Sequence, residues 1–166
     1  MTSIDVGPER AGHPVDLVEQ VASVREWTFD RSGEDEISIA VAGRGSNYAI
    51  SFTWMDDIEA LHLSCAFDAK IPARRRSELI QLLAMVNEQL WIGHFDVWSA
   101  EGVIMYRHSL FLAGGAEVNP RQCEALIEIA LETCERYFQA FQFVIWAGRT
   151  PKEALEAVLF ETQGEA

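Results

Sequence analysis

Four short stretches between residues 27 and 67 alternate large apolar side chains with small or polar ones, and this pattern constrains the fold more than any other feature of the chain. A period of two residues is that of a β-strand with one buried face. The linkers, such as residues 43–47 and 55–57, are too short for the crossover that parallel strands require. The sequence therefore predicts three or four consecutive antiparallel strands.

Segments with apolar residues at helical spacing precede and follow these strands. Asn119 and Pro120 supply a helix cap and a first-turn proline, and Gln122 completes a capping box. The helix that follows should extend to about residue 147, a length of roughly 40 Å at 1.5 Å per residue. Four helices are predicted in all, at residues 14–25, from Pro72 to a C-cap at Gly93, at residues 120–147, and in a short segment after Thr150.

Residues 94–98 and 103–112 have strand character and are separated by a four-residue turn, which predicts a hairpin. The expected architecture is α+β, with an antiparallel sheet of about five to six strands covered by helices. Its expected order is helix, three to four strands, helix, two-strand hairpin, long helix and short helix. Residues 1–13 are expected to be a disordered tail, and residues 14–166 a single domain.

The formal net charge is −13, with 26 acidic and 13 basic residues. A negative surface repels phosphate backbones and anionic lipid headgroups, so nucleic acid and membrane partners are not expected. The N-terminal residues lack the basic and apolar regions of a signal peptide, and the three cysteines lack CxxC spacing. A cytoplasmic location is expected.

Candidate catalytic and metal sites are few. His62, His94 and His108 fall on predicted strands, where three converging imidazoles would suit zinc, yet no HxH or HExxH spacing supports a metal site. Residues 43–46 lie between two strands and lack the strand-to-helix setting of a phosphate loop, so a hairpin turn is favoured. Cys65 shares the alternation of a buried strand face, which predicts an unreactive thiol. No catalytic residue and no cofactor are predicted.

Three consecutive arginines, Arg74, Arg75 and Arg76, fall in the first turn of a predicted helix. Cations there oppose the helix macrodipole, so each arginine needs a compensating partner. One interpretation is local pairing with Asp68 or Glu78. The other is a basic patch that binds an acidic segment of a partner.

Two apolar surfaces are candidates for protein contact. On the strand at residues 94–98, His94 and Trp98 lie opposite Phe95 and Val97, so one aromatic face is left over after the core is filled. The apolar stripe of the long helix is too wide for one neighbour, which predicts a homodimer contact. Its candidate residues are Ile127, Cys134, Tyr137, Phe138, Phe141 and Ile145.

Four segments, at residues 65–75, 90–98, 105–108 and 147–151, resemble the YbjN family of bacterial proteins, described as sensory transduction regulators. The resemblance extends from about residue 14 to the end. It implies a fold similar to that of type III secretion chaperones, usually dimeric, and no catalytic residues. The helix after Thr150 extends beyond the simplest version of that fold.

Two hypotheses for function remain open at the level of sequence. The first is a non-enzymatic protein-binding module, a chaperone-like or regulatory dimer that holds a partner segment on the sheet face or at Arg74 to Arg76. The alternative is a small-ligand sensor or enzyme with a pocket lined by Tyr106, His108, His94 and Trp98.

Overall fold

The computed structural model describes residues 10–98 and 100–164. Its strands are β1 (Thr28–Arg31), β2 (Glu36–Ala42), β3 (Asn47–Met55), β4 (Ala60–Lys70), β5 (His94–Trp98) and β6 (Val103–Phe111). Its helices are α1 (Pro14–Val24), the 3-10 turn η1 (Ala73–Arg75), α2 (Arg76–Asn87), α3 (Pro120–Ile145) and α4 (Pro151–Gly164). The α+β class and the predicted order of elements are confirmed.

The strands form one six-stranded antiparallel sheet in the order β1-β2-β3-β4-β6-β5. The inversion of the last two strands means that β6 is central and β5 forms an edge. A register shift interrupts the pairing of β4 with β6 between Ala66 and Lys70. The four N-terminal strands follow one another as neighbours, as the short turns require.

The two faces of the sheet differ in chemistry, as two adjacent rows of residues across all six strands show. One row faces the helices and is apolar: Phe29, Ile39, Ile50, Cys65, Tyr106 and Phe95. The next row faces the other way and is polar: Asp30, Ser38, Ser51, Ser64, Arg107 and His94. Antiparallel sheets with this division bury one face only.

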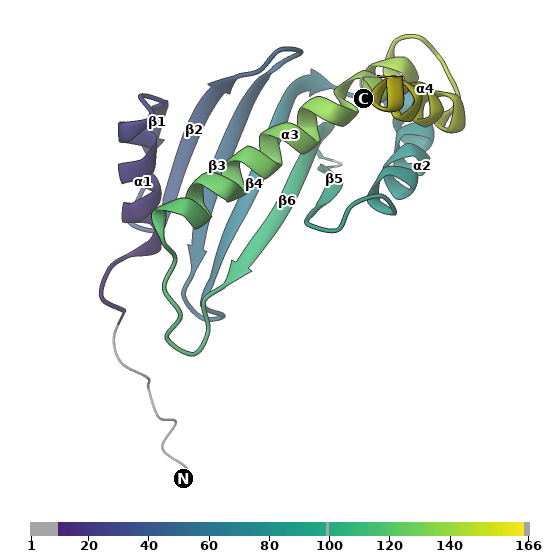
Figure 1. Ribbon diagram of the computed structural model, residues 1–166. Helices are drawn as coiled ribbons and strands as arrows, with labels where there is room; N and C mark the ends of the chain where they lie inside the picture. Colours follow the sequence, from purple (N-terminus) through teal and green to yellow (C-terminus); the bar gives the residue numbers. More distant parts are fainter. Residues whose placement is uncertain (1–9, 99, 165–166) are drawn as a thin grey trace.

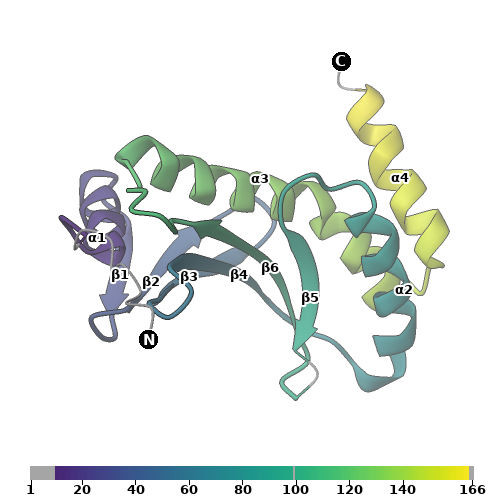
Figure 2. The ribbon, with the colours of Figure 1, turned by 90° about the horizontal axis from the view of Figure 1, so that it is seen from below.

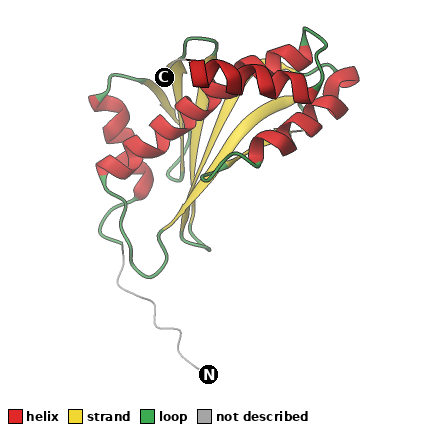
Figure 3. Cartoon of the chain, turned by 45° about the vertical axis from the view of Figure 1, so that its right-hand side comes forward, coloured by secondary structure: helices red, strands yellow, loops and turns green. Residues whose placement is uncertain are grey.

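The helices all lie on the side of the apolar face (Figures 1 and 2). α3 crosses the sheet diagonally, α1 packs near β1 to β3, and α2 contacts β5. α4 packs on α2 and α3, farther from the strands (Figure 3). Among the described residues no helix covers the opposite side, which is called the uncovered face below.

α3 begins as the sequence predicts. Asn119 Oδ1 accepts from the Gln122 backbone N–H at 2.8 Å, and Gln122 Oε1 accepts from the Asn119 N–H at 2.9 Å. These two bonds satisfy amides that the first helical turn leaves without partners. α3 then packs against the sheet and against α1, α2 and α4.

These several neighbours within one subunit account for the wide apolar stripe of α3. Five of the six predicted dimer-contact residues are at most 4% exposed, namely Ile127, Cys134, Tyr137, Phe141 and Ile145. The sixth, Phe138, is half-buried and packs edge-on against Phe67. The assignment of the stripe to a dimer contact is therefore wrong for the five buried residues, because periodicity measures how much surface is covered and not which chain covers it.

The second helix is shorter than predicted. Pro72 precedes the 3-10 turn, α2 ends at Asn87, and Gly93 lies five residues beyond its C-cap Glu88. Gly93 has φ +71°, and a Cβ there would lie 2.3 Å from Tyr106 Oη. Gly93 is therefore required by the turn into β5 and not by the end of the helix.

The chain ends of the described region make specific contacts. Arg10, in the segment assigned to the tail, pairs with Glu59 at 3.1 Å and lies 4.9 Å from the Trp54 ring centroid. Residues 1–9 of that segment lie outside the described residues. At the other end, the Thr150 hydroxyl accepts from the Glu153 N–H at 3.2 Å and begins α4. No helix in the described ranges is long and apolar enough to cross a membrane.

Candidate functional site

The sheet has a step where β5 stops short of the end of β6. The last pair between them joins His94 to Arg107, so β6 extends past β5 from His108 to Phe111 (Figure 1). Along these residues the outer edge of β6 has no strand partner within the described part of the chain. This segment is called the sheet step. Free strand edges of this kind can pair with another segment of extended chain.

A hollow of about 680 Å³ lies next to the sheet step and opens on the uncovered face. It is called the polar hollow, and its lining comes from β3, β4, β6 and the start of β5: Thr53, Met55, His62, Gly93, His94, Arg107, His108 and Ser109. Four of these eight residues are histidine or arginine. On a chain of net charge −13, this is a local concentration of hydrogen-bonding groups around the cation Arg107.

A directed chain of hydrogen bonds runs through the polar hollow. The Arg107 Nε–H donates to His62 Nε2 at 3.4 Å, and His62 Nδ1 lies 2.9 Å from Ser109 Oγ. Because an arginine side chain can only donate, His62 Nε2 accepts and its proton is on Nδ1. His62 therefore donates to Ser109, and the Ser109 O–H is directed to another acceptor.

This direction argues against catalysis by Ser109. A serine nucleophile needs a base that accepts its proton, and here the imidazole donates to the hydroxyl instead. Desolvation by burial lowers the pKa of His62, and the charges of Arg107, His94 and His108 lower it further. A weak base whose free lone pair already accepts from Arg107 does not activate a hydroxyl.

An apolar groove of about 170 Å³ lies on the helix side of the same step. Its walls come from the loop before β5, from β6 and from α3, and comprise Ile92, His108, Leu110, Gln122, Ala125, Leu126 and Ile129. Trp91, in the loop before β5, and Phe111, at the end of β6, are 100% and 69% exposed. The sheet step therefore has a polar hollow on one side and an apolar groove on the other, and His108 lines both.

The predicted partner-binding residues around β5 and β6 do not share one pocket. His94 and the half-exposed Trp98 lie on the uncovered face, opposite Phe95, as the alternation predicts. Tyr106 faces the helices, is 1% exposed, and donates its hydroxyl to the Ile92 carbonyl at 2.7 Å. The predicted ligand pocket lined by Tyr106, His108, His94 and Trp98 is therefore wrong, because the pleat places Tyr106 on the opposite face from His94 and Trp98.

The three strand histidines also do not form a metal centre. His108 pairs with Leu63 on the helix side, whereas His62 and His94 lie on the uncovered face. Within the described ranges no group of three histidine, cysteine or acidic side chains is placed to hold a metal ion. The donor set of the polar hollow is suited to hydrogen bonding and not to metal coordination.

The arginine run is dispersed by the fold. Arg75 pairs with Glu78 at 2.9 Å, which is one of the two local pairings considered from the sequence. Arg74 is exposed, whereas Arg75 and Arg76 are half-buried, and their guanidinium groups lie beside Gly148 and Gly102. The side chain of Asp68, the other predicted partner, lies outside the described residues. The basic group that sequence reasoning missed is Arg107.

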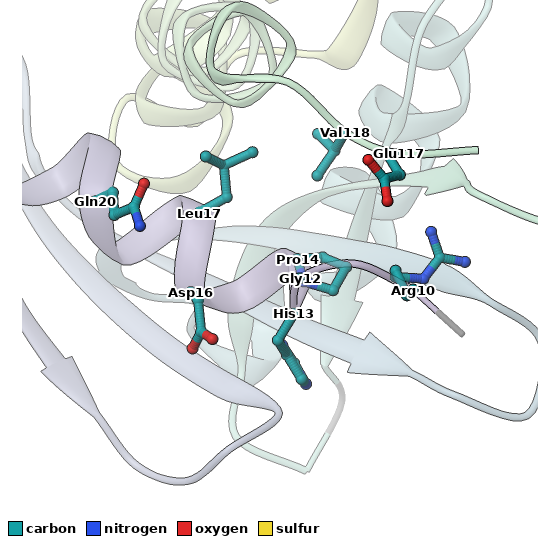
Figure 4. A pocket seen from close by; sticks show the side chains of 9 residues that line it. All are labelled: Arg10, Gly12, His13, Pro14, Asp16, Leu17, Gln20, Glu117 and Val118. Carbon is teal, nitrogen blue, oxygen red and sulfur yellow. The ribbon is translucent and has the colours of Figure 1, made fainter. Parts of the chain in front are cut away.

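A third hollow, of about 260 Å³, lies between the start of α1 and the loop before α3 (Figure 4). Its polar side chains bind other parts of the chain. His13 Nε2 lies 2.7 Å from Asp35, Asp16 pairs with Arg31 at 2.9 Å, and Glu117 accepts from the Ala11 N–H at 3.2 Å. These contacts fasten the N-terminal segment and α1 to β1, to the β1–β2 turn and to the loop before α3, so this hollow has a structural role.

Comparison with solved structures supports the fold. YbjN from E. coli superposes with a TM-score of 0.54 at 12% identity, covering 81% of this chain and 90% of that one. The ExsC-ExsE complex gives a TM-score of 0.52 at 15% identity, covering 74% and 88%. The predicted likeness to a type III secretion chaperone fold is thereby confirmed. No curated protein matches the sequence significantly.

The sequence itself matches a family model over residues 14–143, which spans α1 to the last turn of α3. The family is described as "Putative bacterial sensory transduction regulator". α4 lies beyond the matched range, so the resemblance expected from about residue 14 to the end is shown only as far as residue 143. Because the match covers most of the 166 residues, the chain belongs to the YbjN family.

Proposed function

We propose that this protein is a non-enzymatic binding module, chaperone-like or regulatory, that holds an extended segment of a partner protein at the sheet step. The observation that carries the proposal is the free edge of β6 from His108 to Phe111, with a polar hollow on one side and an apolar groove on the other. Backbone groups along a free edge supply affinity, and hollows on its two sides supply specificity.

The geometry explains why an extended segment is the expected partner. A strand paired with residues 108–111 would continue the line of β5 and place its side chains alternately on the two faces. One set would meet the polar hollow and the other the apolar groove. Exposed Trp91, Ile92 and Phe111 lie on the segments that border this path and would be covered on binding.

The comparisons are consistent with this proposal at the level of fold. One similar structure is a complex of two proteins, and the family description refers to regulation. The hydrogen-bond direction at Ser109 removes the one serine and histidine pair in the polar hollow from consideration as a catalytic site. The three cysteines are free and buried, which fits the reducing cytosol proposed as the compartment.

Site-specific photocrosslinking tests the proposal. A benzoylphenylalanine residue at Phe111 or Ile92 should capture the same partner from the native cytosol, with the crosslink mapped by mass spectrometry. The matched control is Val24, which is 81% exposed at the C-terminal end of α1. Capture at the two step positions and not at Val24 supports the site. Equal capture at all three, or at Val24 alone, would contradict it.

We also propose that the protein is a homodimer and that its contact lies at the α2 and α4 end. Ile80, Trp146 and Phe160 are 53%, 61% and 78% exposed, and α4 packs directly on α2 and α3. Apolar side chains exposed on one end of a molecule favour an interface there. Light scattering at micromolar concentration should give twice the mass of 18.6 kDa, and Phe160→Glu should shift it toward the monomer. A monomeric parent protein would refute the dimer.

A further inference from the structure

We infer that the polar hollow is a carboxylate-binding subsite, which selects an acidic side chain on the partner segment held at the sheet step. This inference rests on the proposed function and adds the chemical class of the partner. It follows from the direction of the hydrogen bonds in the hollow, from the groups that remain free to donate, and from the position of the hollow beside the free edge of β6.

The hydrogen bonds from Arg107 to His62 and from His62 to Ser109 run in one direction, toward the position of an acceptor on the ligand. Arg107 donates to His62, and His62 donates to Ser109, so each bond in the series polarises the next. The Ser109 oxygen accepts from His62, and its own proton is therefore available to a ligand. An acceptor at this position would receive the last hydrogen bond of a chain that begins on a cation, and a carboxylate oxygen is the strongest acceptor in proteins.

Other groups in the polar hollow reinforce this preference. The Thr53 hydroxyl lies one strand away from His62, directly across the β3–β4 pair. Arg107 uses Nη1 toward Asp96 at 3.2 Å and Nε toward His62, and a guanidinium carries five N–H donors in all. The arginine can thus bind Asp96 and a ligand together.

Asp96 decides how the site recognises its ligand. Its Oδ2 lies 3.2 Å from Arg107 Nη1 and 3.6 Å from His94 Nε2, so it balances the charge of the arginine. Long-range attraction is weakened by this pairing. Recognition therefore depends on the N–H and O–H donors of the hollow at short range. Both oxygens of a carboxylate can accept from these donors, whereas an amide has an NH₂ group in place of one oxygen.

The position of the hollow fixes where the acidic residue must stand in the bound segment. Ser109 and Leu110 are neighbours on β6, and they face the polar hollow and the apolar groove. A strand paired with them places adjacent residues on the same two sides. The inferred partner motif is therefore an acidic residue flanked by apolar ones.

Two synthetic peptides test the inference directly. The probes are acetyl-Val-Glu-Val-Glu-Val-amide and its counterpart with Gln in place of Glu, titrated into full-length protein and followed by NMR. The Glu peptide should bind about tenfold more tightly, because hydrogen bonds to charged acceptors are stronger than those to neutral ones. Ser109→Ala and Arg107→Gln should each remove most of this preference. Ser38→Ala, in the polar row on β2, is the matched control and should leave it unchanged.

The possible outcomes separate the inference from the proposed function. Equal affinity for the two peptides would overturn the carboxylate subsite and leave the segment-binding function in place. A preference for Glu that survives both Ser109→Ala and Arg107→Gln would also overturn it, because the polar hollow would not be its source. If neither peptide binds, the inference fails, while capture at Phe111 still decides the proposed function independently.

Discussion

The carboxamide of Asn87 pairs with the backbone of Phe95 as a neighbouring strand would. Its Oδ1 accepts from the Phe95 N–H at 2.8 Å, and its Nδ2 donates to the Phe95 carbonyl at 3.1 Å. The last residue of α2 thus occupies part of the edge of β5. This protected edge contrasts with the open sheet step on β6, so the fold blocks one free edge and leaves the adjacent one available.

Replacing Asn87 by Ala should loosen β5 specifically. The change removes both hydrogen bonds from half-buried groups, which predicts a loss of about 1–3 kcal/mol in the free energy of unfolding. Hydrogen exchange should show faster exchange of the Phe95 amide. Gln81→Ala, at an exposed position of the same helix, is the control and should change neither quantity. Unchanged exchange at Phe95 would show that the pairing does not hold the edge.

Glu135 on α3 fastens the turn between β2 and β3. Its carboxylate accepts from the backbone N–H groups of Arg44 at 2.6 Å and Gly45 at 3.3 Å. Glu135→Ala would leave these amides without their charged acceptor, and we expect it to cost about 1–3 kcal/mol in urea unfolding. The exposed Glu132 is the matched control on the same helix, and Glu132→Ala should lie within about 0.5 kcal/mol of the parent. Equal effects of the two changes would contradict the role of Glu135.

Replacing Gly45 tests how closely the turn between β2 and β3 approaches α3. A Cβ at this position would lie 2.7 Å from Phe138 Cδ1, so Gly45→Ala must displace the ring. We expect a loss of about 1–3 kcal/mol, the usual cost of overpacking. Gly33→Ala, where an added Cβ would have no atom within 4 Å, should be neutral or slightly stabilising. A neutral Gly45→Ala would mean that the turn is free to move away from α3.

These contacts show which parts of the fold the sequence can predict. The capping box at Asn119 and the turn at residues 43–46 depend on residues a few positions apart, and both occur as expected. The turn closes with a hydrogen bond from the Gly43 N–H to the Ser46 carbonyl at 2.8 Å. Local chemistry determines such features, so they can be read from a single sequence.

The polar hollow could not be predicted in the same way. The alternation correctly assigned the sides of the strands at residues 60–67 and 103–112, but nothing in the sequence shows that β4 pairs with β6. That pairing brings His62 to Arg107 and Ser109 across 45 and 47 residues of chain. The end of α2 at Asn87 could not be predicted for a related reason. The Asn87 side chain binds the backbone of Phe95, and the spacing of apolar residues gives no information on such a contact.

Alkaline pH should destabilise the protein through buried acids. Desolvation, with a smaller contribution from Glu124, raises the pKa of Cys123 from 9.0 to about 11, and desolvation raises the pKa of Tyr106 from 10.0 to about 12. Between pH 9 and 11 the unfolded chain loses the Cys123 proton while the folded chain retains it. Stability should therefore fall as pH rises, by about 1.4 kcal/mol per pH unit for each such group.

Urea unfolding at pH 8, 9, 10 and 11 measures this dependence. Cys123→Ala removes one of the titrating groups, so its stability should fall less steeply between pH 9 and 11, whatever its stability at pH 8. The raised pKa of Cys123 also predicts that this thiol reacts slowly with Ellman's reagent at pH 8 in the folded protein, because little thiolate is present. A slope identical to that of the parent protein would show that Cys123 does not titrate as described.

The pKa of His62 reports whether Arg107 acts on this imidazole in the polar hollow. Desolvation lowers its pKa below the ordinary 6.5, and the nearby Arg107 contributes the next largest effect. The unfolded chain therefore binds a proton at His62 more readily than the folded chain does, and this group reduces stability as pH falls below 6.5. Arg107→Gln removes the cation and should raise the pKa of His62, as followed by NMR of the imidazole protons, while Arg121→Gln on the exposed side of α3 should not. A pKa that stays constant in Arg107→Gln would indicate that Arg107 does not act on His62, and the donor series through Ser109 would lose its first member.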